Sequence, residues 1–216
     1  MNGKKRLFTG LGLLALFILW TWLVRTVDVR PVGPRGSEVG FAALNLWVHE
    51  RTGVHMWLYH VTDWLGLVPL FVCVTFGGLG AAQLFRRRSL LRVDADLLAL
   101  GVYYVLVIGC YLAFEMYPVN YRPILIGGVA ETSYPSSTTL LVLCVMPTLV
   151  LQTNRRVQNP ALKRWVRLVS VAFSLLMVVG RLLSGVHWLT DIVGGVLLSA
   201  GLFCLYRAGV QRWQNT

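Results

Sequence analysis

Residues 7–24 read LFTGLGLLALFILWTWLV, an apolar run that contains no charged residue. A helix of about 20 apolar residues is long enough to cross the hydrocarbon core of a bilayer. Lys4, Lys5 and Arg6 precede the run, and Arg25 follows it without a small-residue cleavage site. We therefore interpret it as a retained membrane span rather than as a secretory signal.

Further apolar runs of similar character follow along the chain, at residues 57–85, 97–114, 135–151, 166–183 and 187–206. None of them alternates apolar and polar residues as a strand of a membrane barrel does. Of the 216 residues, 56% are hydrophobic and only 13% are charged, well below the charged share of a soluble domain. The sequence predicts an all-α, polytopic membrane helix bundle, with six transmembrane helices in a single domain spanning residues 1–216.

The basic residues that give the net charge of +11 are concentrated on one side of the membrane. In a six-span arrangement, 14 of the 20 basic residues fall on one side: residues 4–6, 86–88, 92, 155, 156, 163, 164, 167, 207 and 212. The positive-inside rule assigns that side to the cytoplasm. We thus expect a multi-pass protein of the cell membrane with both termini inside, and we read the charge as a topology signal that also attracts membrane lipids, with no nucleic acid as partner.

The first outer segment, residues 25–56, is long enough to carry structure of its own. Its second half includes FAALNLWVHE at residues 41–50, with apolar residues at helical spacing. We predict a short helix there, lying at the membrane interface. The four cysteines all lie in apolar runs without the spacing of metal ligands, so we expect no metal, no cofactor and no disulfide.

A cluster of unusual residues joins the fifth and sixth runs, in GRLLSGVHWLTD at residues 180–191. His187 and Asp191 are four residues apart and would share one face at the start of a helix. A carboxylate beside an imidazole fixes its tautomer and leaves the other ring nitrogen free to act as a nucleophile or base. Arg181 is costly at membrane depth unless it has a partner or a ligand. A functional site is the favoured interpretation; the alternative is an Arg181–Asp191 ion pair that joins two helices.

The fourth run opens with Pro-Ser-Ser-Thr at residues 135–138. Proline at the first helical position suits a helix start. The free N–H groups at such a start form an anion site, and here they would belong to Ser136, Ser137 and Thr138. The alternative is plain helix capping. Because Arg122 and Arg181 are expected at the same side, phosphate binding is the favoured interpretation.

Together these residues resemble the type 2 phosphatidic acid phosphatase superfamily, from about the second span to the sixth. The most specific part is RLLSGVHWLTDIVGG at residues 181–195, with Arg, His and Asp at the family's spacing. The resemblance implies a phosphatase, mostly of lipids, that needs no metal. His187 would attack phosphorus to form a phosphohistidine, and Asp191 would orient it. The phosphate would be held by Arg122, Arg181, Ser136, Ser137 and Thr138.

Two positions depart from the family pattern. Glu115 stands where the family usually has a lysine, and Thr138 stands where the family has the histidine that protonates the leaving group. A hydroxyl does not titrate near neutrality, so Thr138 cannot take over that role. Other ionisable groups are expected on the outer side, and Glu131 is the first candidate substitute because it is near in sequence. The others are Glu115, His49, His55 and His60.

The missing acid bears on the substrate. Loss of a general acid typically costs about 10²–10⁴-fold in rate, and a lipid alkoxide needs that proton. A phosphate monoester, with a second pKa of about 6, leaves without one. We therefore expect a membrane phosphatase of a lipid phosphate or diphosphate, with polyprenyl diphosphate such as undecaprenyl diphosphate as the specific hypothesis, acting on the extracytoplasmic side. The alternatives are a phospho-headgroup transferase on the same fold and a non-catalytic phospholipid binder or transporter.

Overall fold

The structure is a computed structural model that describes residues 2–213. These residues form α-helices and short 3₁₀ turns, with isolated β-bridges but no β-strand among them. The elements are α1 (Gly3–Thr26), η1 (Pro34–Gly36), α2 (Ala42–Thr52), α3 (Met56–Leu65), α4 (Leu67–Arg87), η2 (Leu90–Arg92), α5 (Ala95–Met116), α6 (Ser137–Arg156), α7 (Pro160–Leu183) and α8 (Leu189–Trp213). Six helical segments within residues 2–213 are long and apolar enough to cross a membrane, with α3 and α4 forming one of them. The all-helical, six-span prediction is confirmed.

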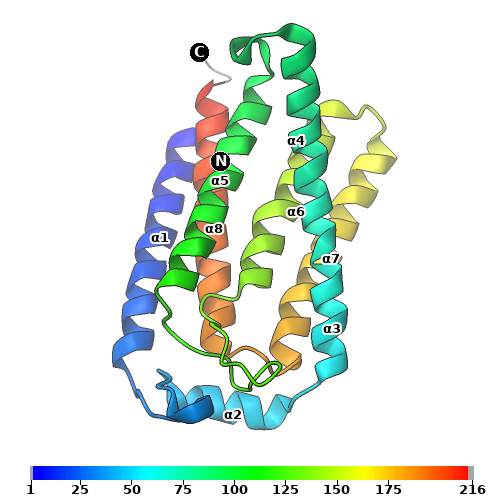
Figure 1. The fold of residues 1–216 in the computed structure, drawn as a ribbon. Coiled ribbons are helices and arrows are strands. Elements are labelled where there is room, and N and C mark those ends of the chain that lie inside the picture. Colours follow the sequence, from blue (N-terminus) through cyan, green and yellow to red (C-terminus); the bar gives the residue numbers. More distant parts are fainter. Residues whose placement is uncertain (1, 214–216) are drawn as a thin grey trace.

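The spans pack as a bundle in which α6 and α8 are the central helices (Figure 1). In their apolar windows 56% of the residues are buried inside the bundle, against 17–22% in the other spans. α1 packs mainly along α8, α7 packs along α6, and α4 and α5 complete the ring. The outer helices expose large apolar side chains such as Phe8, Phe71 and Phe85. Such a surface suits lipid as the surrounding solvent.

The two ends of the bundle differ in what they carry (Figure 1). At one end lie the first turn of α1, the last turn of α8 and the α4–α5 and α6–α7 connections; we call it the basic end because Arg86–Arg88, Arg155 and Arg156 are there. At the other end lie α2, the segment 117–136 and the turn between α7 and α8. We call it the site end, for the residues described below.

Several predicted span boundaries shift. The run predicted over residues 57–85 is two consecutive helices, α3 and α4, interrupted at Gly66, whose N–H donates to the carbonyl oxygens of Thr62 and Asp63. The apolar stretch 41–50 is helical, as α2, although its position at a membrane interface stays a prediction. The spans predicted over residues 7–24, 97–114 and 166–183 are each longer in the structure, because basic and polar residues continue the helices past the apolar runs.

Two corrections concern the starts of α6 and α8. The fourth span does not begin at Pro135 but at Ser137, because Ser136 is the N-cap and its side chain accepts a hydrogen bond from the N–H of Thr139 at 3.5 Å. The sixth span does not begin at His187 but at Leu189. The Asp191 carboxylate accepts the N–H of Trp188 at 2.9 Å and thereby ends the turn in front of the helix.

Candidate active site

The turn between α7 and α8 carries the candidate nucleophile. Gly185 has φ +69, a conformation that favours glycine, and a β-carbon there would overlap the carbonyl oxygen of Gly53. The carbonyl oxygen of Ser184 accepts the N–H of His55 at 3.0 Å. The turn is therefore clamped against the α2–α3 connection, and His187 follows it in a fixed position.

His187 is 3% exposed, so its ring faces the interior of the bundle rather than lipid. Its Nδ1 atom lies 3.7 Å from Oδ2 of Asp191, longer than a hydrogen bond. Catalytic hydrogen bonds of this kind are often loose before substrate binds. Burial lowers the pKa of His187 to about 4, although the neighbouring Asp191 opposes that shift. The imidazole is therefore neutral near pH 7, which is the form that carries a nucleophilic lone pair.

Asp191 is held rigidly by donors from two directions. Its Oδ2 accepts the N–H of Trp188 at 2.9 Å, and its Oδ1 accepts Nδ2 of Asn120 at 3.2 Å. Both Asp191 and Asn120 are fully buried. Sequence reasoning missed Asn120, since nothing in the chain marks it apart from its place two residues before Arg122. Its bond fixes the carboxylate that faces His187, so we regard Asn120 as a positioning residue.

The start of α6 presents two free amides rather than three. The N–H of Ser136 was predicted to be free, but it donates to the carbonyl oxygen of Asp191 in α8 at 3.1 Å. The N–H groups of Ser137 and Thr138 donate to no other residue in the described chain. They lie at the positive end of a 20-residue helix, where an anion is stabilised. Helix capping by Ser136 and a free pair of amides thus occur together.

Arg181, at the end of α7, is 3% exposed and holds Thr138 and Asp63 together. Its Nε and Nη2 atoms donate to Oγ1 of Thr138 at 2.9 and 2.6 Å, and Nη2 also lies 3.0 Å from Oδ1 of Asp63. The guanidinium carbon is 5.0 Å from the centre of the Tyr59 ring. The predicted alternative was an ion pair between Arg181 and Asp191. That prediction is wrong, because Arg181 pairs with Asp63 of α3 instead.

Arg122 is positioned by the irregular segment 117–136, which folds back on itself. Its N–H donates to the carbonyl oxygen of Glu131 at 3.0 Å, and its Nε lies 3.0 Å from Oε2 of Glu131. That side-chain contact is short enough for an ion pair but lacks hydrogen-bond geometry. The guanidinium carbon is 5.7 Å from the Tyr59 ring, so the two arginines flank the same tyrosine. Glu115 instead accepts the hydroxyl of Thr132 at 2.6 Å.

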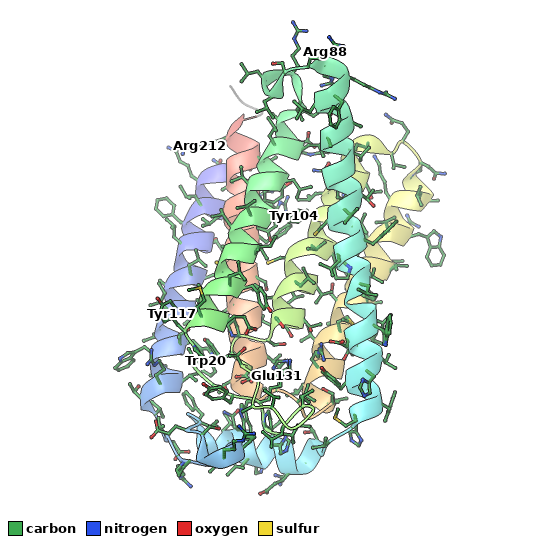
Figure 2. All side chains as sticks on the ribbon, in the orientation of Figure 1. Trp20, Arg88, Tyr104, Tyr117, Glu131 and Arg212 are labelled. Atoms are coloured by element: carbon green, nitrogen blue, oxygen red, sulfur yellow. The ribbon has the colours of Figure 1, made fainter. Side chains whose placement is uncertain are left out.

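The three other histidines named as substitutes also lie at the site end, and Nδ1 of His49 is buried there without a hydrogen-bond partner among residues 2–213. His55 Nε2 lies 2.9 Å from the carbonyl oxygen of Thr52. The ring of His49 packs on Trp188 at 5.5 Å, and the ring of His60 packs on Tyr59 at 5.2 Å. Within residues 2–213, no hydrogen bond joins any of these rings to Thr138 or Arg181. Glu131, Trp20 and Tyr117 lie toward the site end in Figure 2, whereas Arg88 and Arg212 lie at the basic end.

Several buried polar atoms at the site end have no hydrogen-bond partner among residues 2–213. They include Nε and Nη1 of Arg122, Nη1 of Arg181, Nδ1 of His49 and both ring nitrogens of His187. Buried donors are almost always satisfied, and two arginines that each keep an unpartnered guanidinium nitrogen, together with the free amides of α6, can form a cradle for an oxyanion. The neutral imidazole of His187 in the same region adds a nucleophile. The arrangement can bind a phosphate group and attack it.

Comparisons with known proteins agree with this chemistry. The PAP2 superfamily matches residues 7–215. Sphingosine-1-phosphate phosphatase 2 from Mus musculus and from Homo sapiens are each 35% identical over 77 residues, which are 36% of this chain. The aligned part is 21% and 19% of those proteins, so the chain spans about a fifth of the length of these relatives.

A solved structure shares the fold. The crystal structure of a transmembrane PAP2-type phosphatidylglycerolphosphate phosphatase from Bacillus subtilis matches with a TM-score of 0.65 at 18% identity. The match covers 96% of this chain and 97% of that one. The helices are thus arranged as in a known membrane fold, and the family match over residues 7–215 confirms the family resemblance. Because the family match extends over nearly the whole chain, the protein belongs to the PAP2 superfamily.

Proposed function

We propose that the protein is a membrane phosphatase that removes the phosphate group of a lipid through a phosphohistidine at His187. One observation carries this proposal: Arg122 and Arg181 each keep a buried, unpartnered guanidinium nitrogen, and both cations are near enough to lower the pKa of His187, whose ring is itself unpartnered. Two arginines alone would be sufficient for a protein that only binds phosphate. A buried, neutral imidazole next to Asp191 is in addition a potential nucleophile, as an enzyme requires.

The phosphate group is bound by charge and by backbone. Nη1 of Arg122 and Nη1 of Arg181 donate to its oxygens, and the N–H groups of Ser137 and Thr138 face it from the start of α6. The hydroxyl of Thr138 accepts two N–H bonds from Arg181, which uses both of its lone pairs and leaves its own proton to donate to the phosphate. These donors offset the charge that develops on the transferring group.

His187 performs the chemical step. Its Nδ1–H faces Asp191, which leaves the lone pair of Nε2 to attack phosphorus. The bond between phosphorus and the lipid oxygen breaks, and the imidazole becomes a cationic phosphohistidine that Asp191 stabilises. Water then attacks the phosphorus, the N–P bond breaks, and phosphate leaves with His187 restored to its neutral form.

A lipid phosphate monoester is the favoured substrate class. The relatives are named for sphingosine-1-phosphate and phosphatidylglycerolphosphate, and both compounds are lipid phosphates. The exposed apolar side chains of the outer helices are those of a protein embedded in a bilayer, where a lipid substrate also resides.

Polyprenyl diphosphate, presented from the outer leaflet, is the second candidate, and the threonine at position 138 favours it. Without a histidine at that position, a substrate whose leaving group is itself a phosphate monoester has an advantage, because that group departs without a proton. The product would be the lipid monophosphate. Release of phosphate from polyprenyl diphosphate many times faster than from a lipid monoester would favour this substrate.

The decisive experiment traps the covalent intermediate. The purified protein in detergent is mixed with a ³²P-labelled lipid phosphate and quenched in alkali, in which phosphohistidine survives. We expect a labelled protein and released phosphate, both absent in His187→Ala. Label and turnover that persist in His187→Ala would overturn the assignment of the nucleophile. Turnover that requires an added alcohol would identify a headgroup transferase, and lipid binding without any label would identify a binder.

A further inference from the structure

A proton donor for the leaving group has to be found outside position 138. The hydroxyl of Thr138 points its acceptor lone pairs at Arg181 and has no titratable proton near neutrality. A lipid alkoxide leaving from a monoester must nevertheless be protonated as the phosphorus–oxygen bond breaks. The donor has to lie beside the phosphate cradle, in contact with the space that the lipid part of the substrate occupies.

Asp63 of α3 lies next to Thr138. Its Oδ1 atom is 3.0 Å from Nη2 of Arg181, and that same nitrogen donates to Oγ1 of Thr138 at 2.6 Å. One guanidinium nitrogen thus bridges the threonine and the carboxylate. The side chain of Asp63 is 59% exposed, and its second oxygen forms no hydrogen bond within residues 2–213. That oxygen is available to a substrate.

A cavity extends from these residues between α4, α5 and α6. It has a volume of about 430 Å³, and Asp63, Ser137 and Thr138 form its polar end. The remaining wall is apolar and includes Leu67, Leu70 and Leu112. A phosphate in the cradle would place its lipid chain along this wall, since apolar surface is the favourable neighbour of a hydrocarbon chain. The oxygen that joins chain to phosphate then lies at the polar end, where Asp63 is the carboxyl group.

The other carboxylates at the site end are placed less well. Glu131 pairs with Arg122 on the segment 117–136, and it does not line the cavity. Glu115 accepts the hydroxyl of Thr132. The charged and titratable groups around Asp63 are Arg181 from α7, Tyr59 and His60 one turn earlier on α3, and Tyr111 across the cavity on α5.

We infer that Asp63 is the general acid that replaces the histidine missing at position 138. The inference rests on the proposed function. As Nε2 of His187 forms its bond to phosphorus and the bond to the lipid oxygen breaks, the proton of the Asp63 carboxyl group moves to that oxygen, so that an alcohol leaves. The Asp63 carboxylate then takes a proton from the water that attacks the phosphohistidine. Phosphate is released, and both side chains return to their initial state.

The test compares leaving groups in Asp63→Asn. Asparagine keeps an oxygen that accepts from Arg181 but carries no transferable proton. We expect kcat for an alkyl phosphate, such as a short-chain lipid phosphate, to fall about 10²–10⁴-fold. The kcat for p-nitrophenyl phosphate, whose phenolate leaves without a proton, should stay within a few-fold of the unchanged enzyme. The phosphohistidine should still be trapped from the aryl substrate.

Two further measurements distinguish a general-acid role of Asp63 from a purely structural role. Thr138→His in the Asp63→Asn background should restore part of the alkyl phosphatase rate, because it returns an acid to the family position. In the unchanged enzyme, kcat for the alkyl substrate should show a solvent deuterium isotope effect, from the proton transferred to the leaving oxygen, that Asp63→Asn removes. Neither result follows if Asp63 only orients Arg181.

The matched control is Asp96→Asn. Asp96 also pairs with arginines from another helix, Arg155 at 3.3 Å and Arg156 at 3.0 Å, but at the basic end. It should change neither rate. Equal losses on alkyl and aryl substrates in Asp63→Asn would overturn the inference while leaving the phosphatase intact. No turnover and no trapped intermediate with either substrate in the unchanged enzyme would instead overturn the proposed function.

Discussion

Burial determines the chemistry of His187. A histidine in water titrates near 6.5, and a ring with that pKa would be half charged close to physiological pH. In the bundle, burial lowers the pKa of His187 to about 4, and the positive Arg122 acts in the same direction. The residue therefore keeps its lone pair at neutral pH, and the two arginines that we propose as phosphate ligands also help to keep His187 neutral.

This environment predicts the acid limb of the pH profile. Because the pKa in the folded protein is depressed, the neutral ring persists from neutrality down to about pH 4 and is lost as the pH falls through that value. We expect kcat/KM for p-nitrophenyl phosphate, corrected for the titration of the substrate, to fall about tenfold per pH unit below about 4. The same ring contributes stability above pH 6.5 that is lost as the pH drops toward 4. An acid limb centred near 6.5 would contradict the buried position of His187.

Asn120 donates to Asp191 and is thereby placed to act on His187, the proposed nucleophile. Its amide donates to a fully buried carboxylate at 3.2 Å, and hydrogen bonds to charged groups contribute about 1.5–3 kcal/mol. We expect Asn120→Ala to lower kcat by about 10–100-fold with little change in KM, since the phosphate cradle is untouched. The pH at the acid limb should shift as well, because a loosened Asp191 interacts differently with the imidazole.

The control for Asn120 is Asn159→Ala. Asn159 caps α7 at the basic end, where its side chain accepts the N–H groups of Ala161 and Leu162 at 2.9 and 3.2 Å. Loss of this cap should cost about 1 kcal/mol of stability without a change in kcat. If both variants lowered kcat in proportion to their loss of thermal stability, Asn120 would be a structural residue only.

At the scale of elements, the turn between α7 and α8 depends on Gly185. Its positive φ costs about 1–2 kcal/mol in any residue with a β-carbon, and the overlap with the carbonyl oxygen of Gly53 adds the cost of displacing the α2–α3 connection. We expect Gly185→Ala to lower the melting temperature in detergent and to abolish phosphatase activity, because His187 follows two residues later. Thermal unfolding and phosphate release measure the two effects.

Gly36 provides the comparison for Gly185. It also has a positive φ, +75, but an added β-carbon would meet no atom within 4 Å. Gly36→Ala should therefore carry only the conformational cost and keep full activity. Equal loss of activity in the two variants would mean that the conformational cost of a positive φ is sufficient to explain the loss, and that the contact between Gly185 and Gly53 is not required.

The sequence predicted the helices well and their ends poorly, for a physical reason. Apolar length alone fixes where a chain can cross a membrane, so all six spans were predictable. The start of α6 depends on the bond from Ser136 to the carbonyl oxygen of Asp191, a residue far along the chain. Such tertiary bonds leave no local pattern, and the Asn120–Asp191 bond was missed for the same reason.

The neighbours of the arginines were also beyond the sequence. Glu131 was the first candidate for a replacement acid because it is near Thr138 in the chain, yet in the structure it pairs with Arg122. Asp63 reaches Arg181 from 118 positions away, because α3 packs along α7. The spacing of residues along the chain predicted candidate site residues within one segment. It could not predict which segments lie next to each other, because helix packing determines that.

At the scale of the whole molecule, charge and site are separated along the bundle. The basic end carries Asp94 and Asp96 in ion pairs with Arg87, Arg155 and Arg156, yet positive charge prevails there. The candidate site lies at the opposite end (Figures 1 and 2). The positive-inside rule assigns the basic end to the cytoplasm, so the structure and the rule together predict a site that opens on the extracytoplasmic side.

Labelling of intact cells tests this orientation. Gly127→Cys places a thiol on the segment 117–136 at the site end, and Arg88→Cys places one at the basic end. A membrane-impermeant maleimide should label the first in intact cells and the second only after the cells are opened. The four native cysteines lie on α4, α5, α6 and α8, within the spans, so the unsubstituted protein should remain unlabelled in both conditions. The reverse pattern would place the phosphate cradle in the cytoplasm. A lipid phosphate of the outer leaflet would then be excluded as substrate, even if the chemistry at His187 were unchanged, because the bundle fixes which leaflet the cradle faces.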